Sequence, residues 1–231
     1  MFTLLSLQAD SLTAATSTAV IENVAPNTEV SVLEFILKGG FFLIPIAILL
    51  LYTFYVIAER YLYIDRASKI DDRLLRDVGE QLQSGNIELA RAIVERSTNA
   101  SSTIIKEGIL VIGRPIAEIE SNMDRAADIE IGQMEKHLGH LGLIAGIAPT
   151  LGFIGTISGV IKIFYSISVT ENISIGNISG GLYEKMISSG AGLIVGIIAY
   201  SAYHLLNGKI DNFALKVQKQ ILEFVNIIQR A

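Results

Sequence analysis

The chain has 231 residues, of which 51% are hydrophobic and 18% charged, and its mean hydropathy is +0.49. Soluble domains usually contain about a quarter charged residues, so this composition favours a membrane protein. The net charge of −5 argues against a nucleic-acid partner, and the absence of cysteine excludes disulfides, thiolate metal sites and cysteine nucleophiles.

Three windows contain no Lys, Arg, Asp or Glu: 39–58, 137–161 and 186–208. Each is long enough for a helix to cross the hydrocarbon layer of about 30 Å. We therefore predict an all-α, polytopic membrane protein with three transmembrane helices, because a helix satisfies its own backbone hydrogen bonds in lipid. No phosphate-binding, dinucleotide-binding or zinc-protease motif and no nucleophile–base set is present, so we expect neither an enzyme nor a bound cofactor or metal.

Residues 1–37 contain no Lys or Arg, and we expect them to form a retained periplasmic segment. The first span is predicted at 38–58, with Pro45 expected to kink it. Basic residues follow its Glu59-Arg60 end at Arg66, Lys69, Arg73 and Arg76. By the positive-inside rule, the N-terminus lies outside and the chain enters the cytoplasm from residue 60.

A helical cytoplasmic domain is predicted over residues 59–137. Breaks are expected at Gly85-Asn86 and at Gly113-Arg114-Pro115. The helices between them are expected at 60–83, 87–96, 103–112 and 116–138. No break is visible between the last helix and the second span, predicted at 138–165, so we expect one long helix that projects from the membrane into the cytoplasm.

The third span is predicted at 182–206, after a periplasmic loop at 166–181. Lysines follow this span, which again places the next segment in the cytoplasm. Residues 207–231 carry apolar side chains at helical spacing. We therefore expect a cytoplasmic C-terminal helix that continues the third span, so that two of the three spans extend into the cytoplasm as long helices.

Small residues recur at steps of three and four along the second and third spans. The candidates for close helix packing are Gly152, Gly155, Gly159, Gly192 and Gly196. In lipid, helix association depends on close backbone contact and on interhelical hydrogen bonds. We expect oligomerisation, because three helices alone could not bury two such faces. Pro149 is expected to bend the second span and to free a backbone carbonyl.

Hydroxyl groups inside the spans have two interpretations that the sequence leaves open. The Thr156 hydroxyl either bonds back to the carbonyl one turn earlier or faces a wet pore, and the same holds for Ser188 and Ser189. Glu184 lies one turn outside Ser188 and is either a helix N-terminal acid or an acid at the outer mouth of a cation path. For His137 and His140, which are three residues apart, we favour interfacial positions over a metal site.

Two stretches resemble signatures of the ExbB/TolQ/MotA proton-channel family: GIAPTLGFIGTISGVIKIF in the second span and NISGGLYEKMISSGAGLIVGIIAY in the third. Glu59-Arg60 at the inner end of the first span also fits this family. The length, the three spans, the outside N-terminus and the helical cytoplasmic segment match its ExbB and TolQ members better than MotA. The resemblance covers about residues 35–220. It implies a homopentamer whose second and third spans line a pore. An ExbD-like dimer of single-span proteins would occupy that pore and supply the membrane aspartate.

The resemblance also implies a role in a Gram-negative inner membrane. Proton flow would move the partner against the pentamer and, through a TonB-like protein, energise outer-membrane transport. The alternatives are a TolQ-like subunit for envelope integrity and a non-conducting membrane scaffold, in which the hydroxyls only pack.

By position, three residues match functional residues of the family. Thr156 matches the pore threonine of the second span, Ser189 that of the third, and Glu184 the acid five residues before it. Because the third-span residue is serine with a second serine beside it, Ser188 could take the same role. Ile198 stands where the family usually has a proline.

Overall fold

The computed structural model describes residues 41–170 and 175–230, so the periplasmic segment expected at 1–37 lies outside the described residues. The described residues form helices and no strand, which confirms the all-α class. The helices are α3 (Leu43–Ala67), α4 (Asp72–Gln83), α5 (Ile87–Glu95), α6 (Ala100–Leu110), α7 (Ile116–Glu135), α8 (Leu138–Thr170) and α9 (Ile175–Arg230). Three helical stretches are long and apolar enough to cross a membrane, at Leu43–Ala67, Ile116–Val169 and Ile178–Gln229, as predicted.

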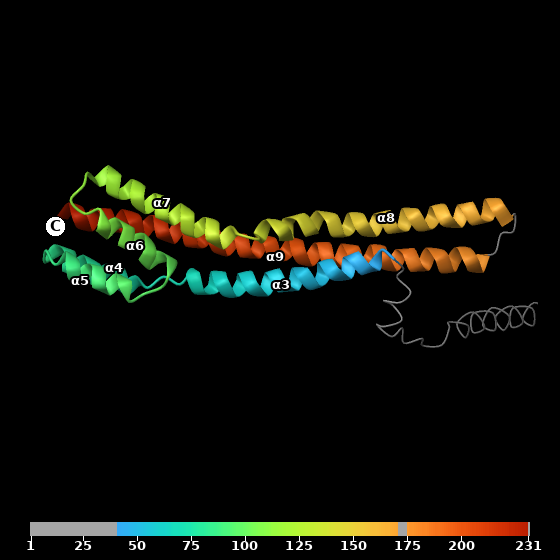
Figure 1. The fold of residues 1–231 in the computed structure, drawn as a ribbon, viewed down its shortest axis with the longest axis horizontal. Helices are drawn as coiled ribbons and strands as arrows, with labels where there is room; N and C mark the ends of the chain where they lie inside the picture. Colours follow the sequence, from blue (N-terminus) through green and yellow to red (C-terminus); the bar gives the residue numbers. More distant parts are fainter. Residues whose placement is uncertain (1–40, 171–174, 231) are drawn as a thin grey trace, which may run out of the picture. The chain divides into compact units, whose positions relative to one another are not determined.

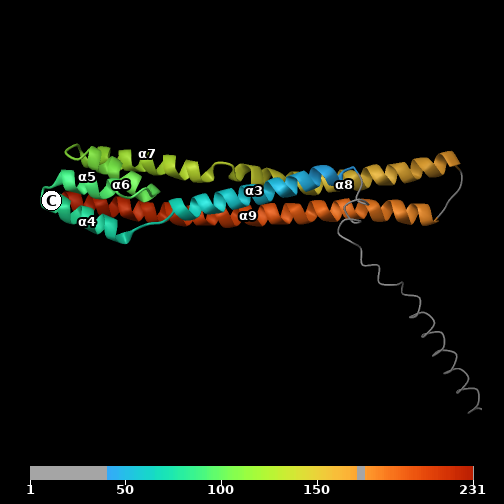
Figure 2. The same ribbon diagram turned by 60° about the horizontal axis from the view of Figure 1, so that its bottom comes forward.

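The membrane part is a bundle of three helices. α8 runs beside the first half of α9, and α3 lies against both of them (Figures 1 and 2). Its buried core is small and contains Ile46 of α3, Ile144 and Ala148 of α8, and Val195 and Ala199 of α9. Most other apolar side chains of these helices point outward, as expected for surfaces that face lipid or another membrane helix.

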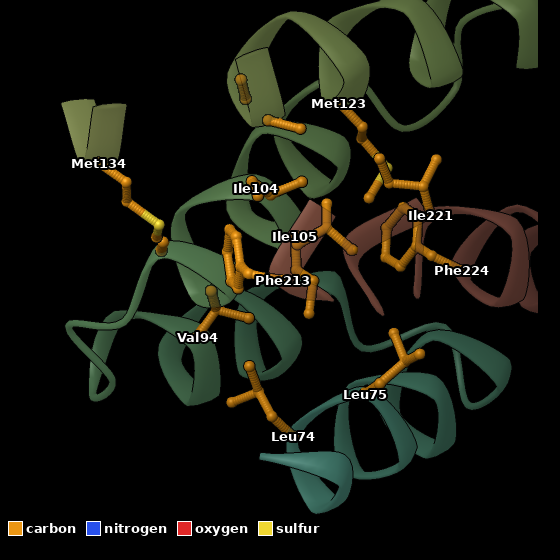
Figure 3. Packing of buried hydrophobic residues seen from close by; sticks show 14 of the residues in the cluster. Leu74, Leu75, Val94, Ile104, Ile105, Met123, Met134, Phe213, Ile221 and Phe224 are labelled. Atoms are coloured by element: carbon orange, nitrogen blue, oxygen red, sulfur yellow. The ribbon is translucent and has the colours of Figure 1, made fainter. Parts of the chain in front are cut away.

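The larger core lies around the second half of α9. Helices α4, α6 and α7 pack on this half, and α5 packs on α4 and α6. This half continues from the third span without interruption, as predicted (Figure 1). Figure 3 shows side chains from five helices that converge there: Leu74, Leu75, Val94, Ile104, Ile105, Met123, Met134, Phe213, Ile221 and Phe224. Inside this core, the Ser101 hydroxyl donates a 2.6 Å hydrogen bond to Gln220 Oε1 and joins α6 to α9.

The expected continuous helix from residue 116 through the second span is wrong. α7 ends at Glu135 and α8 begins at Leu138, and His137 between them has a φ of 68°. A left-handed backbone costs a non-glycine residue about 1–2 kcal/mol. Contacts from elsewhere in the fold must therefore hold this break.

Two residues of α3 supply those contacts. Arg60 is only 6% exposed, and its Nη1 donates a 3.1 Å hydrogen bond to the Gln133 carbonyl in the last turn of α7. Carbonyls in the last turn of a helix lack a partner within the helix, so Arg60 caps α7. Its Nε also donates to Glu59 Oε2 at 2.8 Å, and the same oxygen lies 3.6 Å from His137 Nδ1.

Helix α3 carries the first predicted span. α3 begins at Leu43, so Pro45 stands in the first turn, where backbone amides have no partner within the helix. No helical turn precedes Pro45 in α3, and the expected kink there is wrong. The single helix expected over 60–83 is also wrong, because α3 ends at Ala67 and the Asp71 carboxylate begins α4 by accepting a 3.0 Å hydrogen bond from the Arg73 amide.

The breaks between helices agree with the prediction where a glycine marks them. The predicted breaks at 85–86 and 113–115 are confirmed, and Gly85 and Gly113 have positive φ angles. α8 continues to Thr170 and α9 begins at Ile175, so helix extends into both ends of the stretch 166–181 that was expected to be a loop.

Replacing Arg60 with alanine should open the break between α7 and α8. The substitution removes hydrogen bonds from a charged donor, each worth about 1.5–3 kcal/mol, and leaves the Gln133 carbonyl without its cap. We expect trypsin to cut after Lys136 about tenfold faster in the detergent-solubilised protein, measured by mass spectrometry of the fragments. Arg76→Ala is the control, since the Arg76 side chain is 69% exposed. Equal cleavage rates in the two variants would contradict the capping role.

Candidate functional site

α8 and α9 meet along a seam in which glycines let the two backbones touch. A Cβ on Gly192 of α9 would overlap the carbonyl oxygen of Ala148 on α8, and a Cβ on Gly152 would lie 2.9 Å from the Cα of Ser189. Both positions therefore require glycine. The two stripes of small residues bury each other within one chain, so the argument that they need a second chain is wrong.

Pro149 also lies in the seam. A Cβ on Gly196 would be 2.6 Å from Pro149 Cγ and 3.1 Å from the carbonyl oxygen of Ala145. Pro149 has no N–H to offer the Ala145 carbonyl four residues earlier. This oxygen lies beside Gly196 across the seam. α8 stays helical through Pro149, and the bend predicted there remains a prediction.

Farther from helices α4 to α7, side chains fit between the backbones of α8 and α9. A Cβ on Gly155 would lie 3.0 Å from Ser188 Oγ, and a Cβ on Gly159 would overlap the aliphatic stem of Lys185. The Lys185 side chain is only 17% exposed, and its Nζ donates a 2.6 Å hydrogen bond to Glu184 Oε1. The Glu184 carboxylate is therefore paired with the Lys185 ammonium group in the single chain. The aliphatic stem of Lys185 fills the space beside Gly159.

The two neighbouring serines have different surroundings. Ser188 is fully buried and donates a 2.9 Å hydrogen bond to the Lys185 carbonyl. Ser189 is half-buried, and within the described residues its hydroxyl has no hydrogen-bond partner. Ser189 is thus the serine whose hydroxyl remains available to water.

Thr156 bonds to its own helix. Its Oγ1 donates a 2.7 Å hydrogen bond to the Phe153 carbonyl one turn earlier, and the residue is half-buried. This is the first of the two interpretations that the sequence left open. It does not exclude the second, because the hydroxyl oxygen keeps lone pairs that accept hydrogen bonds from water.

α3 covers one flank of the seam. Phe42, at the start of α3, lies against Gly155, and the Tyr52 hydroxyl is 2.8 Å from His140 Nδ1 on α8. Pro149 comes nine residues after His140, which places it about 180° around α8, on the opposite flank. We call this second side, marked by Pro149 and Gly196, the open flank.

Thr156 and Ser189 both lie on the open flank. Thr156 follows Pro149 by seven residues, about two helical turns, and Ser189 precedes Gly196 by the same interval. The structure therefore brings the hydroxyls at 156 and 189 to one side of the α8–α9 pair. Glu184, five residues before Ser189, is about 140° away around α9 and does not share this side.

A polar network near the break between α7 and α8 was missed by sequence reasoning. The rings of His137 and His140 stack with centroids 5.5 Å apart, and their other partners are Glu59 and Tyr52 of α3. The spacing of three between the histidines was the visible signal. Their partners are about 80 residues away in the chain, which no local pattern reveals.

Comparisons with known proteins agree with these features. Residues 88–219, which include Thr156 and Ser189, match the MotA/TolQ/ExbB proton channel family. A biopolymer transport protein ExbB homolog of Methanothermobacter thermautotrophicus is 30% identical over 189 residues, which cover 81% of this chain and 67% of the relative. An ExbB-like transport protein of Synechocystis is 26% identical over 178 residues, covering 75% and 70%. The Tol-Pal system protein TolQ of Haemophilus influenzae is 27% identical over 108 residues, 47% of each chain.

Replacing Gly192 with alanine should separate α8 from α9, because the added methyl group would overlap a backbone oxygen that cannot rotate away. Overpacking of this kind costs about 1–3 kcal/mol. We expect a lower midpoint of thermal unfolding in detergent, followed by circular dichroism. Gly208→Ala is the matched control on the same helix, since a Cβ there meets nothing within 4 Å. A Gly192→Ala protein as stable as this control would argue against backbone contact at the seam.

Proposed function

Because the chain belongs to the MotA/TolQ/ExbB proton channel family, we propose that it is an ExbB-like subunit of a proton-driven machine in the bacterial inner membrane. The machine energises outer-membrane transport through a TonB-like protein. The N-terminus lies in the periplasm, and helices α4 to α7 with the second half of α9 lie in the cytoplasm. The basic residues after the first and third spans support this orientation. The subunit acts as a channel component and not as an enzyme.

The observation that carries the proposal is the pair of hydroxyls on the open flank. Backbone contact fills the seam between α8 and α9, so a water path has to run along the outside of the pair. In the proposed homopentamer, the open flanks of the copies face a shared lumen, with Thr156 and Ser189 in contact with its water. Hydroxyl groups both donate and accept hydrogen bonds, and can therefore take part in a proton-conducting chain.

Ser189 rather than Ser188 is the pore hydroxyl of α9 in this proposal. Ser188 is fully buried beside Gly155 and already bonded to the Lys185 carbonyl. Glu184 is proposed as the acid at the outer mouth of the path. It pairs with Lys185 and lies about 140° around α9 from Ser189, so it does not line the stretch between the two hydroxyls.

A partner has to supply the group that takes up and releases the proton. The three predicted spans contain one acidic residue, Glu184, and no aspartate. We propose that an ExbD-like dimer of single-span proteins inside the pentamer provides this carboxylate. Each proton that crosses a potential of 100 mV releases about 2.3 kcal/mol, which is the energy available for relative motion of partner and pentamer.

Two other functions each have one observation in their favour. A TolQ-like role in envelope integrity is supported by the similarity to a TolQ protein, which covers a smaller part of the chain than the similarity to the ExbB homolog. A non-conducting scaffold is supported by the hydrogen bond from the Thr156 hydroxyl to its own backbone.

Thr156→Val should abolish proton conduction and preserve assembly. Valine has a similar volume but lacks the hydroxyl, so packing on the open flank is kept and the contact with water is lost. We expect proton influx into vesicles that contain the chain and its partner to fall about tenfold or more, measured with a pH-sensitive dye. Native mass measurement should show an unchanged complex. Undiminished influx would favour the scaffold.

The neighbouring serines provide a matched pair. Ser189→Ala should lower proton influx as Thr156→Val does, whereas Ser188→Ala should leave it nearly unchanged, because the Ser188 hydroxyl bonds only to a carbonyl of its own helix. The reverse order of effects would show that Ser188 faces the pathway. A single-span protein with an aspartate in its helix, co-purified in mild detergent, would support the proposed partner.

A further inference from the structure

Helix α7 exposes a stripe of acidic side chains. Asp124, Asp128 and Glu135 are exposed, and the steps of four and seven between them place them on one face of the helix. Gly132 lies on the same face between Asp128 and Glu135. A Cβ on Gly132 would meet nothing within 4 Å, so the surface is open there.

Helix α9 exposes a stripe of opposite character. Leu215 and Leu222 are 59% and 63% exposed, and Lys219 lies between them at helical spacing, with Lys216 beside it. Large apolar side chains this exposed are costly in the part of the chain that projects from the membrane into water. Their alternation with lysine is typical of a face that contacts another helix.

The charges on the two stripes are unsatisfied in the single chain. Elsewhere in the cytoplasmic helices, acids and bases pair, as Arg91 and Lys106 do with Glu95. Within the described ranges 41–170 and 175–230, neither Asp128 nor Lys219 lies in an ion pair. Asp128 and Lys219 are therefore unpaired within these ranges, even though Arg125 and Glu223, of opposite charge, are exposed close to them in the chain.

The two stripes lie at the same depth along the bundle. A Cβ on Gly108 would contact both Met123 of α7 and Phe224 of α9, so these two residues are level. α7 and α9 run antiparallel. Five residues after Met123 in α7 and five residues before Phe224 in α9, Asp128 is level with Lys219. Nine residues along in the same directions, Gly132 is level with Leu215.

We propose that the α9 stripe of one copy of this chain packs on the α7 stripe of the next copy, with Lys219 paired to Asp128 and Leu215 seated over Gly132. The inference rests on the proposed homo-oligomer and assigns its cytoplasmic interface. Rotation about an axis parallel to the helices leaves depth unchanged, so residues that are level within one chain meet between chains. Two different surfaces that complement each other are what a closed ring of identical subunits requires.

A second copy fits both stripes better than a lipid surface does. Anionic lipid headgroups would attract Lys216 and Lys219 but would repel Asp124 and Asp128 at the same depth. A copy of the chain supplies acid to the lysines and lysine to the acids. It also covers the two leucines, and the open surface at Gly132 allows a close approach of Leu215.

Cross-linking tests the interface directly, because the chain contains no cysteine of its own. The Asp128→Cys, Lys219→Cys double variant is expressed with its partner, and membranes are treated with a short bismaleimide. We expect a ladder of bands at multiples of the chain mass in denaturing gels. The control variant is Glu120→Cys with Asn212→Cys, on the same two helices and also exposed. These positions are offset by about 22 Å in depth and should give no ladder.

The outcomes separate this inference from the function on which it rests. An oligomer that persists in native mass measurements without a ladder, or with a ladder equally strong in the control, would overturn the interface alone. A protein that is monomeric in native membranes extracted with mild detergent would overturn the proposed homo-oligomer as well. As a second variant, Asp128→Lys should weaken the oligomer, and the added exchange Lys219→Asp should restore it if the pair forms.

Discussion

Direct contact between the backbones of α8 and α9 is the constraint on which the membrane part depends. Where Gly192 meets Ala148 and Gly152 meets Ser189, the two helices leave no space for a line of water between them. The same contact fixes the rotation of both helices about their axes. Thr156 and Ser189 consequently lie on the flank that α3 does not cover.

A second feature is that the third span continues unbroken into the larger core, whereas the second span is separated from the helix before it. α9 passes from the membrane part into the larger core as a single helix, whereas α7 and α8 are separated at His137. Arg60 of α3 binds the end of α7 at this break. An unbroken helix therefore joins the membrane part to the larger core through α9, while the junction of α7 and α8 depends on side-chain contacts.

Features that depend on local composition were predictable. The charge-free windows identified three spans, and Gly85 and Gly113 marked turns because a positive φ suits glycine. The break at His137 was not predictable, since no glycine or proline marks it and the capping group comes from α3. The argument that the two stripes of small residues need a second chain was wrong for a related reason. The sequence shows the two stripes but does not show that they face each other within one chain.

The sequence by itself determined that this chain has three helices able to cross a membrane, that the third helix continues beyond its span and which family the chain belongs to, because these follow from composition, periodicity and local motifs. It also identified Thr156, Ser188 and Ser189 as candidate hydroxyls without distinguishing their surroundings. Only the tertiary structure decided that Ser188 is buried while Ser189 shares a flank with Thr156. The physical reason is that helix rotation is set by contacts between glycines and backbone far apart in the chain, which no local pattern encodes.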